Sequence, residues 1–231
     1  MPDPRNPWQA FWRGLRPAIL APLRFGWDQG FWRSALACRA VDRDGNPVPW
    51  LTYPALAWLE SVDFTGQHVL EFGAGYSTLW WARRAAAVVA IEEDPGWHAA
   101  LQARLASPTG DSGNVRLLRA SPSVCPDLGP ALFDVVVIDG GDRLSAARIA
   151  LARVRDTGIV VLDNAEVSWS PDGRGFPILE MFAQRGWSRV DFCGFAPGTA
   201  RQHCTAVFFR PGSAAFQGTS PPRIAPSAIR G

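Results

Sequence analysis

Acidic side chains stand at the ends of several apolar segments of this sequence, and they are the residues best suited to hold a ligand. A carboxylate accepts hydrogen bonds from paired hydroxyls and attracts ammonium groups, whereas it repels phosphate. A ligand that carries hydroxyl and cationic groups therefore fits these acids better than a polyphosphate does. The residues are Glu71 before a glycine turn, Glu92, Asp139, and Asp163 with its neighbour Asn164.

The segments that position these acids alternate between strand and helix patterns from residue 51 to residue 210. We expect strands at 68–72, 87–92, 114–118, 133–139 and 157–163, helices at 53–61, 77–87, 95–106, 143–154 and 176–185, and a closing hairpin from 187–195 and 204–209. This alternation predicts an α/β fold with a doubly wound, seven-stranded sheet and an antiparallel C-terminal hairpin. Because ligands bind beyond the carboxyl ends of the strands in such a sheet, we predict that the acids share one site.

The composition narrows the class of protein. A chain of 231 residues, of which 47% are hydrophobic, suits one domain with additions. The formal charge of +2 argues against a nucleic-acid partner. No apolar run reaches about 18 residues, so we expect no transmembrane segment, and proline and arginine interrupt every candidate signal peptide. The scattered cysteines indicate free thiols and a cytoplasmic location; they are Cys38, Cys125, Cys193 and Cys204.

Lysine is absent from the whole sequence, and every basic side chain other than histidine is an arginine. This absence excludes a Walker-type phosphate loop, a Schiff-base lysine and a lysine general base. Any proton transfer must therefore use another kind of side chain.

The first 50 residues differ from the rest of the chain, because they hold five of the eleven tryptophans and many prolines. The prolines at 2, 4, 7, 17 and 22 predict short helices, at 7–14 and 26–39, rather than one long helix. Three interpretations stay open: a layer packed on the main domain or on a second subunit of a homodimer, a lid over the site, or a weak peripheral membrane contact through tryptophan and arginine. Residues 211–231 indicate a flexible tail.

The glycine turn after the first strand allows two kinds of nucleotide. Gly73 and Gly75 form a G-x-G pattern, and Glu92 follows at the distance expected for a ribose ligand of an NAD(P)-dependent oxidoreductase. The third glycine of that fingerprint is replaced by Thr78, and Glu71 precedes the turn, which disfavours a pyrophosphate. S-adenosylmethionine, which combines a ribose with an amino acid, fits these charges better. An NAD(P) enzyme and a non-catalytic binding module remain alternatives.

Four stretches of the sequence together resemble a known family. VLEFGAGYST, VVAIEED, FDVVVIDGGDR and GIVVLDNAE are similar, in order and position, to the motifs of class I S-adenosylmethionine-dependent methyltransferases. The resemblance covers about residues 50–210 and is nearest to the catechol and caffeoyl-CoA O-methyltransferases and to bacterial relatives with an E-F-G-A/S-G-x-S-T turn. It implies a Rossmann-like fold and methyl transfer to a small-molecule acceptor at oxygen.

The resemblance also implies roles for individual residues of the cofactor site. Gly73 and Gly75 let the backbone approach the cofactor, and Glu92 accepts hydrogen bonds from both ribose hydroxyls. Ser121, in the R-A-S-P segment, corresponds to a contact with adenine. The residues implied near the methionine part or the reacting groups are Glu71, Tyr76, Ser77 and Asp139.

A magnesium site is a further implication of the resemblance. In the catechol-type enzymes, residues matching Asp139, Asp163 and Asn164 hold a divalent metal, and oxygen ligands of this kind suit Mg²⁺. The alternative is that Asp139 orients cofactor or substrate while the other two residues stabilise a turn.

The general base of the catechol-type enzymes, a lysine three residues after the metal-binding acid, is missing. Asp142 occupies that position, and it can act as a base only if its pKa is raised. Arg143 can pair with an acidic substrate or with Asp142 itself. Asp139, Asp142 and Arg143 are therefore the candidate catalytic residues, with His203 as a further candidate and Trp169 as a candidate wall of the acceptor pocket.

Overall fold

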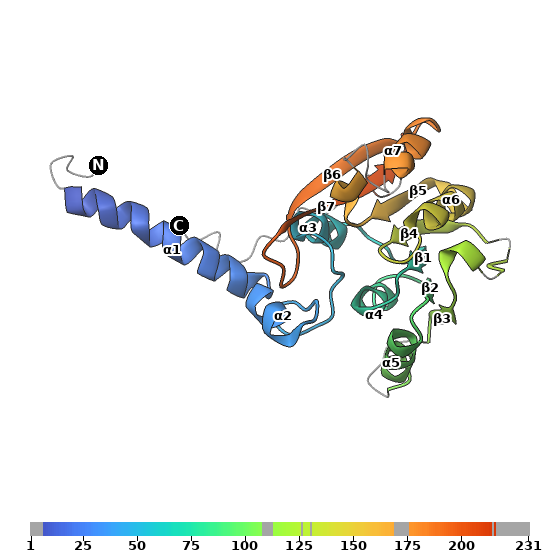
Figure 1. Ribbon diagram of the computed structural model, residues 1–231, viewed down its shortest axis with the longest axis horizontal. Helices are drawn as coiled ribbons and strands as arrows, with labels where there is room; N and C mark the ends of the chain where they lie inside the picture. Colours follow the sequence, from blue (N-terminus) through green and yellow to red (C-terminus); the bar gives the residue numbers. More distant parts are fainter. Residues whose placement is uncertain are drawn as a thin grey trace.

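A seven-stranded mixed sheet forms the centre of the computed structural model, which describes residues 7–107, 113–125, 127–129, 131–168, 176–213 and 215 (Figure 1). The strand order is β3-β2-β1-β4-β5-β7-β6; the first five strands in the chain run parallel, and β7 pairs antiparallel with both β5 and β6. The predicted doubly wound sheet with a terminal hairpin is confirmed. The strands are β1 His68–Phe72, β2 Ala87–Glu92, β3 Val115–Arg119, β4 Phe133–Ile138, β5 Val154–Leu162, β6 Ser188–Phe195 and β7 Gln202–Phe209.

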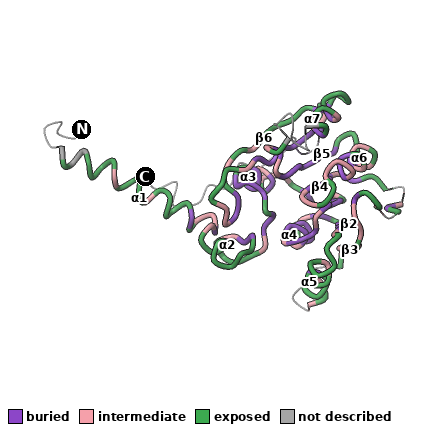
Figure 2. The backbone as a smooth tube through the Cα atoms, in the orientation of Figure 1, coloured by how far each residue is buried: buried purple, intermediate pink, exposed green. Residues whose placement is uncertain are grey.

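Alternate residues of the central strands face two separate hydrophobic cores, as the two-residue period of a strand requires. In β4, Val135 and Val137 join the core under α3, α4 and α5, whereas Val136 and Ile138 join the core under α6 and α7. Figure 2 shows these strands buried between the two layers. The helices are α3 Tyr53–Ser61, α4 Tyr76–Ala82, α5 Pro95–Leu105, α6 Arg143–Arg153 and α7 Phe176–Ala183, with 3-10 turns η1 Pro122–Val124 and η2 Ala165–Ser168.

Helix α4 ends at Ala82, five residues before the predicted end at residue 87. The side chain of Asn114 explains the difference, because its Nδ2 donates hydrogen bonds of 2.9 Å to the carbonyls of both Ala82 and Ala85. These bonds satisfy carbonyl groups at the helix end and turn the chain toward β2.

The N-terminal segment contradicts the sequence prediction of short helices only. Helix α1 spans Pro7–Asp28 without interruption and contains Pro17 and Pro22, and α2 follows at Phe31–Ala37. Each proline removes one N–H donor and crowds the carbonyl four residues before it, whereas the alanine, leucine and arginine residues around them favour a helix. Figure 1 shows α1 extending away from the sheet, so no tightly packed neighbour resists the local distortion that a proline causes.

A left-handed residue redirects the chain between α1 and α2. Gly30 has φ of 72°, and a Cβ there would lie 2.4 Å from the backbone carbon of Asp42. Only glycine fits this position. The ring of Phe25 packs edge-on against Tyr53 at 5.3 Å, which joins the end of α1 to the start of α3.

Backbone hydrogen bonds bring the predicted strand ends to one edge of the sheet. The N–H of Gly73 donates to the Ile91 carbonyl at 2.9 Å, and the N–H of Asp139 donates to the Phe72 carbonyl at 2.9 Å. Asp163 N–H donates to the carbonyl of the last β4 residue at 3.0 Å. The residues that follow β1, β4 and β5 therefore meet at this edge.

Candidate functional site

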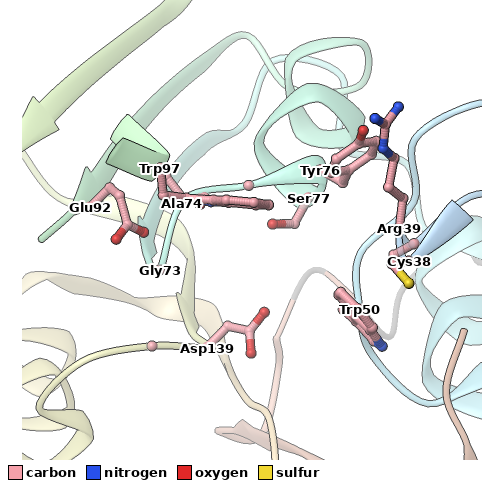
Figure 3. A pocket seen from close by; sticks show the side chains of 13 residues that line it. Cys38, Arg39, Trp50, Gly73, Ala74, Tyr76, Ser77, Glu92, Trp97 and Asp139 are labelled. Atoms are coloured by element: carbon pink, nitrogen blue, oxygen red, sulfur yellow. The ribbon is translucent and has the colours of Figure 1, made fainter. Parts of the chain in front are cut away.

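The carboxyl edge of the sheet opens onto a cavity of about 220 Å³ (Figure 3). The carboxylates of Glu92 and Asp139 face this space, with the glycine turn between them. Six of the residues predicted for the cofactor line it: Gly73, Gly75, Tyr76, Ser77, Glu92 and Asp139.

The N-terminal segment forms the opposite wall of the cavity. Cys38, Arg39 and Ala40, just after α2, and Trp50, just before α3, line it across from Glu92. Of the first 50 residues, these four line the cavity. No pattern in the sequence indicates that these particular residues line the cavity.

Gly73 makes the close approach of the loops after β1 and β4 feasible. Its φ is 91°, and a Cβ there would lie 2.7 Å from the backbone nitrogen of Gly140. A Cβ on Gly140 would in turn lie 2.9 Å from the Gly73 Cα. Two glycines are therefore required where these loops cross, and sequence reasoning identified only the first.

Glu71 lies fully buried beneath the turn, and a threonine hydroxyl links it to the backbone above. Thr78 Oγ1 donates a hydrogen bond to Glu71 Oε2 and accepts one from the Gly75 N–H at 2.9 Å. Burial raises the pKa of Glu71 to about 7, against the opposing effect of the Ser77 and Thr78 hydroxyls. Among the described residues, Glu71 Oε1 has no hydrogen-bond partner. An acceptor is thus left unsatisfied below the turn.

Glu92 and Trp97 form the side of the cavity nearest to β2. The Asp94 N–H donates to Glu92 Oε1 at 2.8 Å, and Asp94 caps α5 by accepting a bond from the Trp97 N–H at 2.6 Å. The indole Nε1–H of Trp97 donates to the Ala74 carbonyl at 2.6 Å, which holds the ring over the turn. Burial raises the pKa of Glu92. Sequence reasoning missed Trp97, although the Asp94–Pro95 helix start places it in the first turn of α5.

Two carboxyl groups, that of the half-buried Asp139 and that of the buried Asp163, lie side by side at the ends of β4 and β5. Burial and their mutual repulsion raise the pKa of Asp139, and burial raises that of Asp163. A hydrogen bond between the two carboxyl groups also favours the protonated form of Asp139. The guanidinium of Arg143 acts in the opposite direction on both. The pair therefore retains a proton more readily than exposed carboxylates do.

The same groups do not fit a magnesium ion. Arg143 donates a hydrogen bond of 2.9 Å to Asn164 Oδ1, the oxygen that the metal would need, and so places a cation there. Asp163 Oδ1 accepts a bond of 3.0 Å from Thr205 Oγ1. Within the described part of the chain, no cluster of three or more acidic, histidine or cysteine side chains could hold a metal. The geometry favours the alternative, in which Asp163 and Asn164 stabilise the turn after β5.

Asp142 does not meet the condition set for a general base. It is the N-cap of α6, where it accepts bonds from the Ser145 N–H at 3.1 Å and the Ser145 hydroxyl at 2.6 Å. These bonds lower the pKa of Asp142, opposite to the shift that a base at neutral pH needs. The predicted catalytic role is therefore withdrawn. Arg143 does not take Asp142 as its partner but reaches Asn164 and the Asp139 carbonyl, the latter at 3.4 Å.

Of two further residues singled out from the sequence, the structure describes only Ser121. Ser121 begins the η1 turn, its hydroxyl 3.0 Å from that of Ser123, and it is not among the residues that line the cavity. Trp169 lies outside the described residues.

A histidine–carboxylate pair stands beside Asn164. His203 Nδ1 lies 3.2 Å from Glu166 Oε1 and 3.3 Å from Asn164 Nδ2, and the Cys204 N–H donates to Glu166 Oε2 at 2.8 Å. Because the pair is joined only by the pairing of β7 with β5, no sequence spacing indicates it. Glu166 was missed for this reason.

Comparisons with known proteins agree with this fold. A family model described as a methyltransferase domain matches residues 70–165. No protein of curated function matches the sequence. The cofactor-bound structure of Rv0187 from MTB is 22% identical, with a TM-score of 0.58 over 84% of this chain and 96% of that chain.

Two solved O-methyltransferases are also similar. The enzyme from Bacillus cereus in complex with SAH is 18% identical, with a TM-score of 0.52 over 77% of this chain and 88% of that chain. TomG from Streptomyces achromogenes in complex with SAM is 23% identical, with a TM-score of 0.50 over 67% and 77%. The chain therefore has the Rossmann-like fold of the class I S-adenosylmethionine-dependent methyltransferases.

Proposed function

We propose that this protein transfers a methyl group from S-adenosylmethionine to an oxygen atom of a small-molecule acceptor. The buried carboxyl of Glu71, with its unsatisfied Oε1 under the glycine turn, carries the proposal. Together with Asp139 and Glu92, it places carboxyl oxygens at this edge of the sheet, and these hydrogen-bond acceptors suit ribose hydroxyls and an ammonium group better than a pyrophosphate. This is the physical reason to prefer S-adenosylmethionine to NAD.

The cavity residues fit the parts of this cofactor. Glu92 has one oxygen engaged by the Asp94 N–H and faces the cavity, where a ribose diol would donate to it. Trp97 offers an aromatic wall, and the turn at Gly73 exposes backbone beside the buried acids. Ser77 at the start of α4 would contact the methionine part.

Methyl transfer depends mainly on holding the acceptor oxygen and the methyl group in line, because the reaction is a direct displacement. When bound, S-adenosylmethionine supplies the electrophilic methyl group. The protein must position the acceptor and accept its hydroxyl proton. The cover formed by Trp50 and the segment 38–40 would exclude water from that step.

His203 is the group that we propose accepts the proton. Its Nδ1 faces Glu166, which as a carboxylate favours a proton on Nδ1 and so leaves Nε2 as the acceptor. Asn164 lies between His203 and Arg143, and Arg143 in turn reaches the Asp139 carbonyl at the edge of the cavity. The O-methyltransferases of similar fold from Bacillus cereus and Streptomyces achromogenes support oxygen as the acceptor atom.

Release of S-adenosylhomocysteine from S-adenosylmethionine, measured with a panel of small phenols, enols and carboxylates, tests the proposal. His203→Ala should reduce the turnover of an accepted substrate by about 10²- to 10⁴-fold, the usual contribution of a general base. His68→Ala is the matched control, because His68 lies at the opposite end of β1. Turnover that survives in His203→Ala would refute the base while leaving methyl transfer intact. Turnover of amines but of no oxygen acceptor would refute the proposed atom.

A further inference from the structure

Helix α1 carries an exposed apolar face along most of its length. At 100° per residue, one arc of the helix collects Phe11, Leu15, Trp8, Ile19, Trp12 and Leu23. Trp8, Trp12 and Ile19 are 70%, 61% and 52% exposed. Figures 1 and 2 show this helix extending from the domain with most of its residues exposed. An apolar face of this size in water calls for a partner.

All charged side chains of α1 before its last residue, Asp28, are basic. Arg13, Arg16 and Arg24 are exposed, and no acidic residue precedes Asp28 in the helix. On the helical wheel, Arg13 and Arg24 lie opposite the apolar arc, and Arg16 lies at its border. A partner that complements this helix must therefore offer an apolar layer to the apolar arc and a negatively charged layer to the arginines.

The exposed apolar surface continues past the end of α1. Trp27, Trp32 and Leu36 are 74%, 43% and 89% exposed, and they line a groove of about 400 Å³ together with Arg33 and Arg43. Exposed tryptophan and arginine side chains thus occur on both N-terminal helices. This pairing suits the boundary between lipid headgroups and acyl chains, where indole rings and guanidinium groups are each stable.

A second copy of the chain is a poorer partner for this face. Pairing two α1 helices through their apolar arcs would bring the two Arg16 side chains to the seam and would leave Arg13 and Arg24 of each helix without an acidic partner on α1 before Asp28. A membrane span is also a poor fit, because no described helix is long and apolar enough to cross a bilayer. An anionic lipid surface satisfies both the apolar arc and the arginines.

We propose that α1, continued by the exposed face of α2, binds this protein peripherally to membranes that contain anionic phospholipid. The helix lies parallel to the surface with its tryptophans at the headgroup level. Residues 38–40, directly after α2, line the cavity at the sheet edge, so that this contact also fixes the cavity close to the lipid surface. The proposal does not depend on the proposed methyl transfer.

Flotation of the full chain with vesicles of phosphatidylcholine, with and without 30% phosphatidylglycerol, tests this contact. We expect the wild type to float only with the anionic vesicles. Arg13→Glu/Arg16→Glu/Arg24→Glu should reduce the partition coefficient by at least about 100-fold, because each basic residue near an anionic surface contributes about fivefold and each glutamate adds repulsion. Trp8→Ser/Trp12→Ser should also reduce it by removing the anchors.

The matched control changes the same number of charges elsewhere. Arg116→Glu/Arg119→Glu/Arg185→Glu alters exposed arginines of β3 and the end of α7, and it should float like the wild type. Equal loss in the control would show that net charge, and not α1, determines binding, and would overturn the proposal. Failure of the folded wild type to float would also overturn it. So would a dimer in analytical ultracentrifugation that Trp8→Ser/Trp12→Ser dissociates, since a second copy would then cover the face.

Discussion

Thr78 Oγ1 donates a hydrogen bond to the buried carboxyl of Glu71 while accepting one from the Gly75 N–H at 2.9 Å. One hydroxyl thus ties the glycine turn to the acid beneath it. A glycine in place of Thr78, as in a dinucleotide-binding fingerprint, would remove both bonds. Thr78, which stands where that fingerprint has a glycine, therefore depends on Glu71 as its hydrogen-bond acceptor.

The raised pKa of Glu71 makes stability depend on pH. The unfolded chain releases this proton near pH 4.5, whereas the folded chain holds it to about pH 7. Between these values the folded state binds more protons, so its stability is highest below pH 4.5 and falls as pH rises to 7. Glu71→Gln should remove this fall and be more stable than the wild type at pH 8 by about 3 kcal/mol. Denaturant unfolding at pH 5 and pH 8 measures the difference, and parallel pH profiles for the two proteins would contradict it.

Glu92 should contribute to cofactor affinity more than its neighbour Glu93 does. Glu92→Ala leaves ribose hydroxyls without an acceptor, which should weaken S-adenosylhomocysteine binding by about 1–3 kcal/mol. Glu93→Ala is the control, because this exposed carboxylate does not line the cavity. Calorimetric titration of both variants measures the effect. Equal affinities of the Glu92→Ala and Glu93→Ala variants for S-adenosylhomocysteine would show that Glu92 does not bind the cofactor.

The two glycines of the turn should respond differently to a methyl group. Gly73→Ala places a Cβ 2.7 Å from the Gly140 nitrogen at φ of 91°, and should cost about 2–4 kcal/mol of folding free energy. Gly75→Ala meets only Trp97, at 3.6 Å, and should change stability by less than about 1 kcal/mol. Because Gly75 lines the cavity, its variant should instead bind S-adenosylhomocysteine more weakly. Thermal melts measure the stability of each variant, and calorimetric titrations measure its affinity for S-adenosylhomocysteine. A stable Gly73→Ala variant together with a strongly destabilised Gly75→Ala variant would contradict the prediction.

Magnesium should not change the cofactor-binding properties of the protein. Arg143 already occupies Asn164 Oδ1, so added Mg²⁺ or a chelator should leave both the melting temperature and the S-adenosylhomocysteine affinity unchanged. A Mg²⁺-dependent rise in melting temperature that Asp163→Asn abolishes would restore the metal site.

The parts of the fold and site that the sequence predicts are those set by local patterns and by the geometry of parallel sheets. The strands around Glu71, Glu92 and Asp139 are apolar and short, and their carboxyl ends must meet at one edge. The capping role of Asp142 was also readable, since Ser145 follows it by three residues. The hydroxyl and the N–H of Ser145 both donate to the Asp142 carboxylate, so this carboxylate caps α6 and does not act as a base.

The parts that the sequence does not predict depend on contacts between distant segments. Glu166 and His203 meet only because β7 folds back beside β5, and Trp50 reaches the cavity through the path of the N-terminal segment. The continuity of helix α1 was not predicted, because the two prolines inside it disfavour a helix and its exposure depends on the tertiary fold (Figure 1). An exposed helix tolerates a local loss of hydrogen bonds that a packed one does not.

Binding of S-adenosylhomocysteine to the purified full chain, measured by calorimetry with NAD as the comparison ligand, is the most direct test of the proposed cofactor. The predicted result is saturable binding of one S-adenosylhomocysteine per chain that Glu92→Ala weakens, with no heat from NAD. Folded protein that binds no S-adenosylhomocysteine, or that binds NAD in its place, would contradict the account.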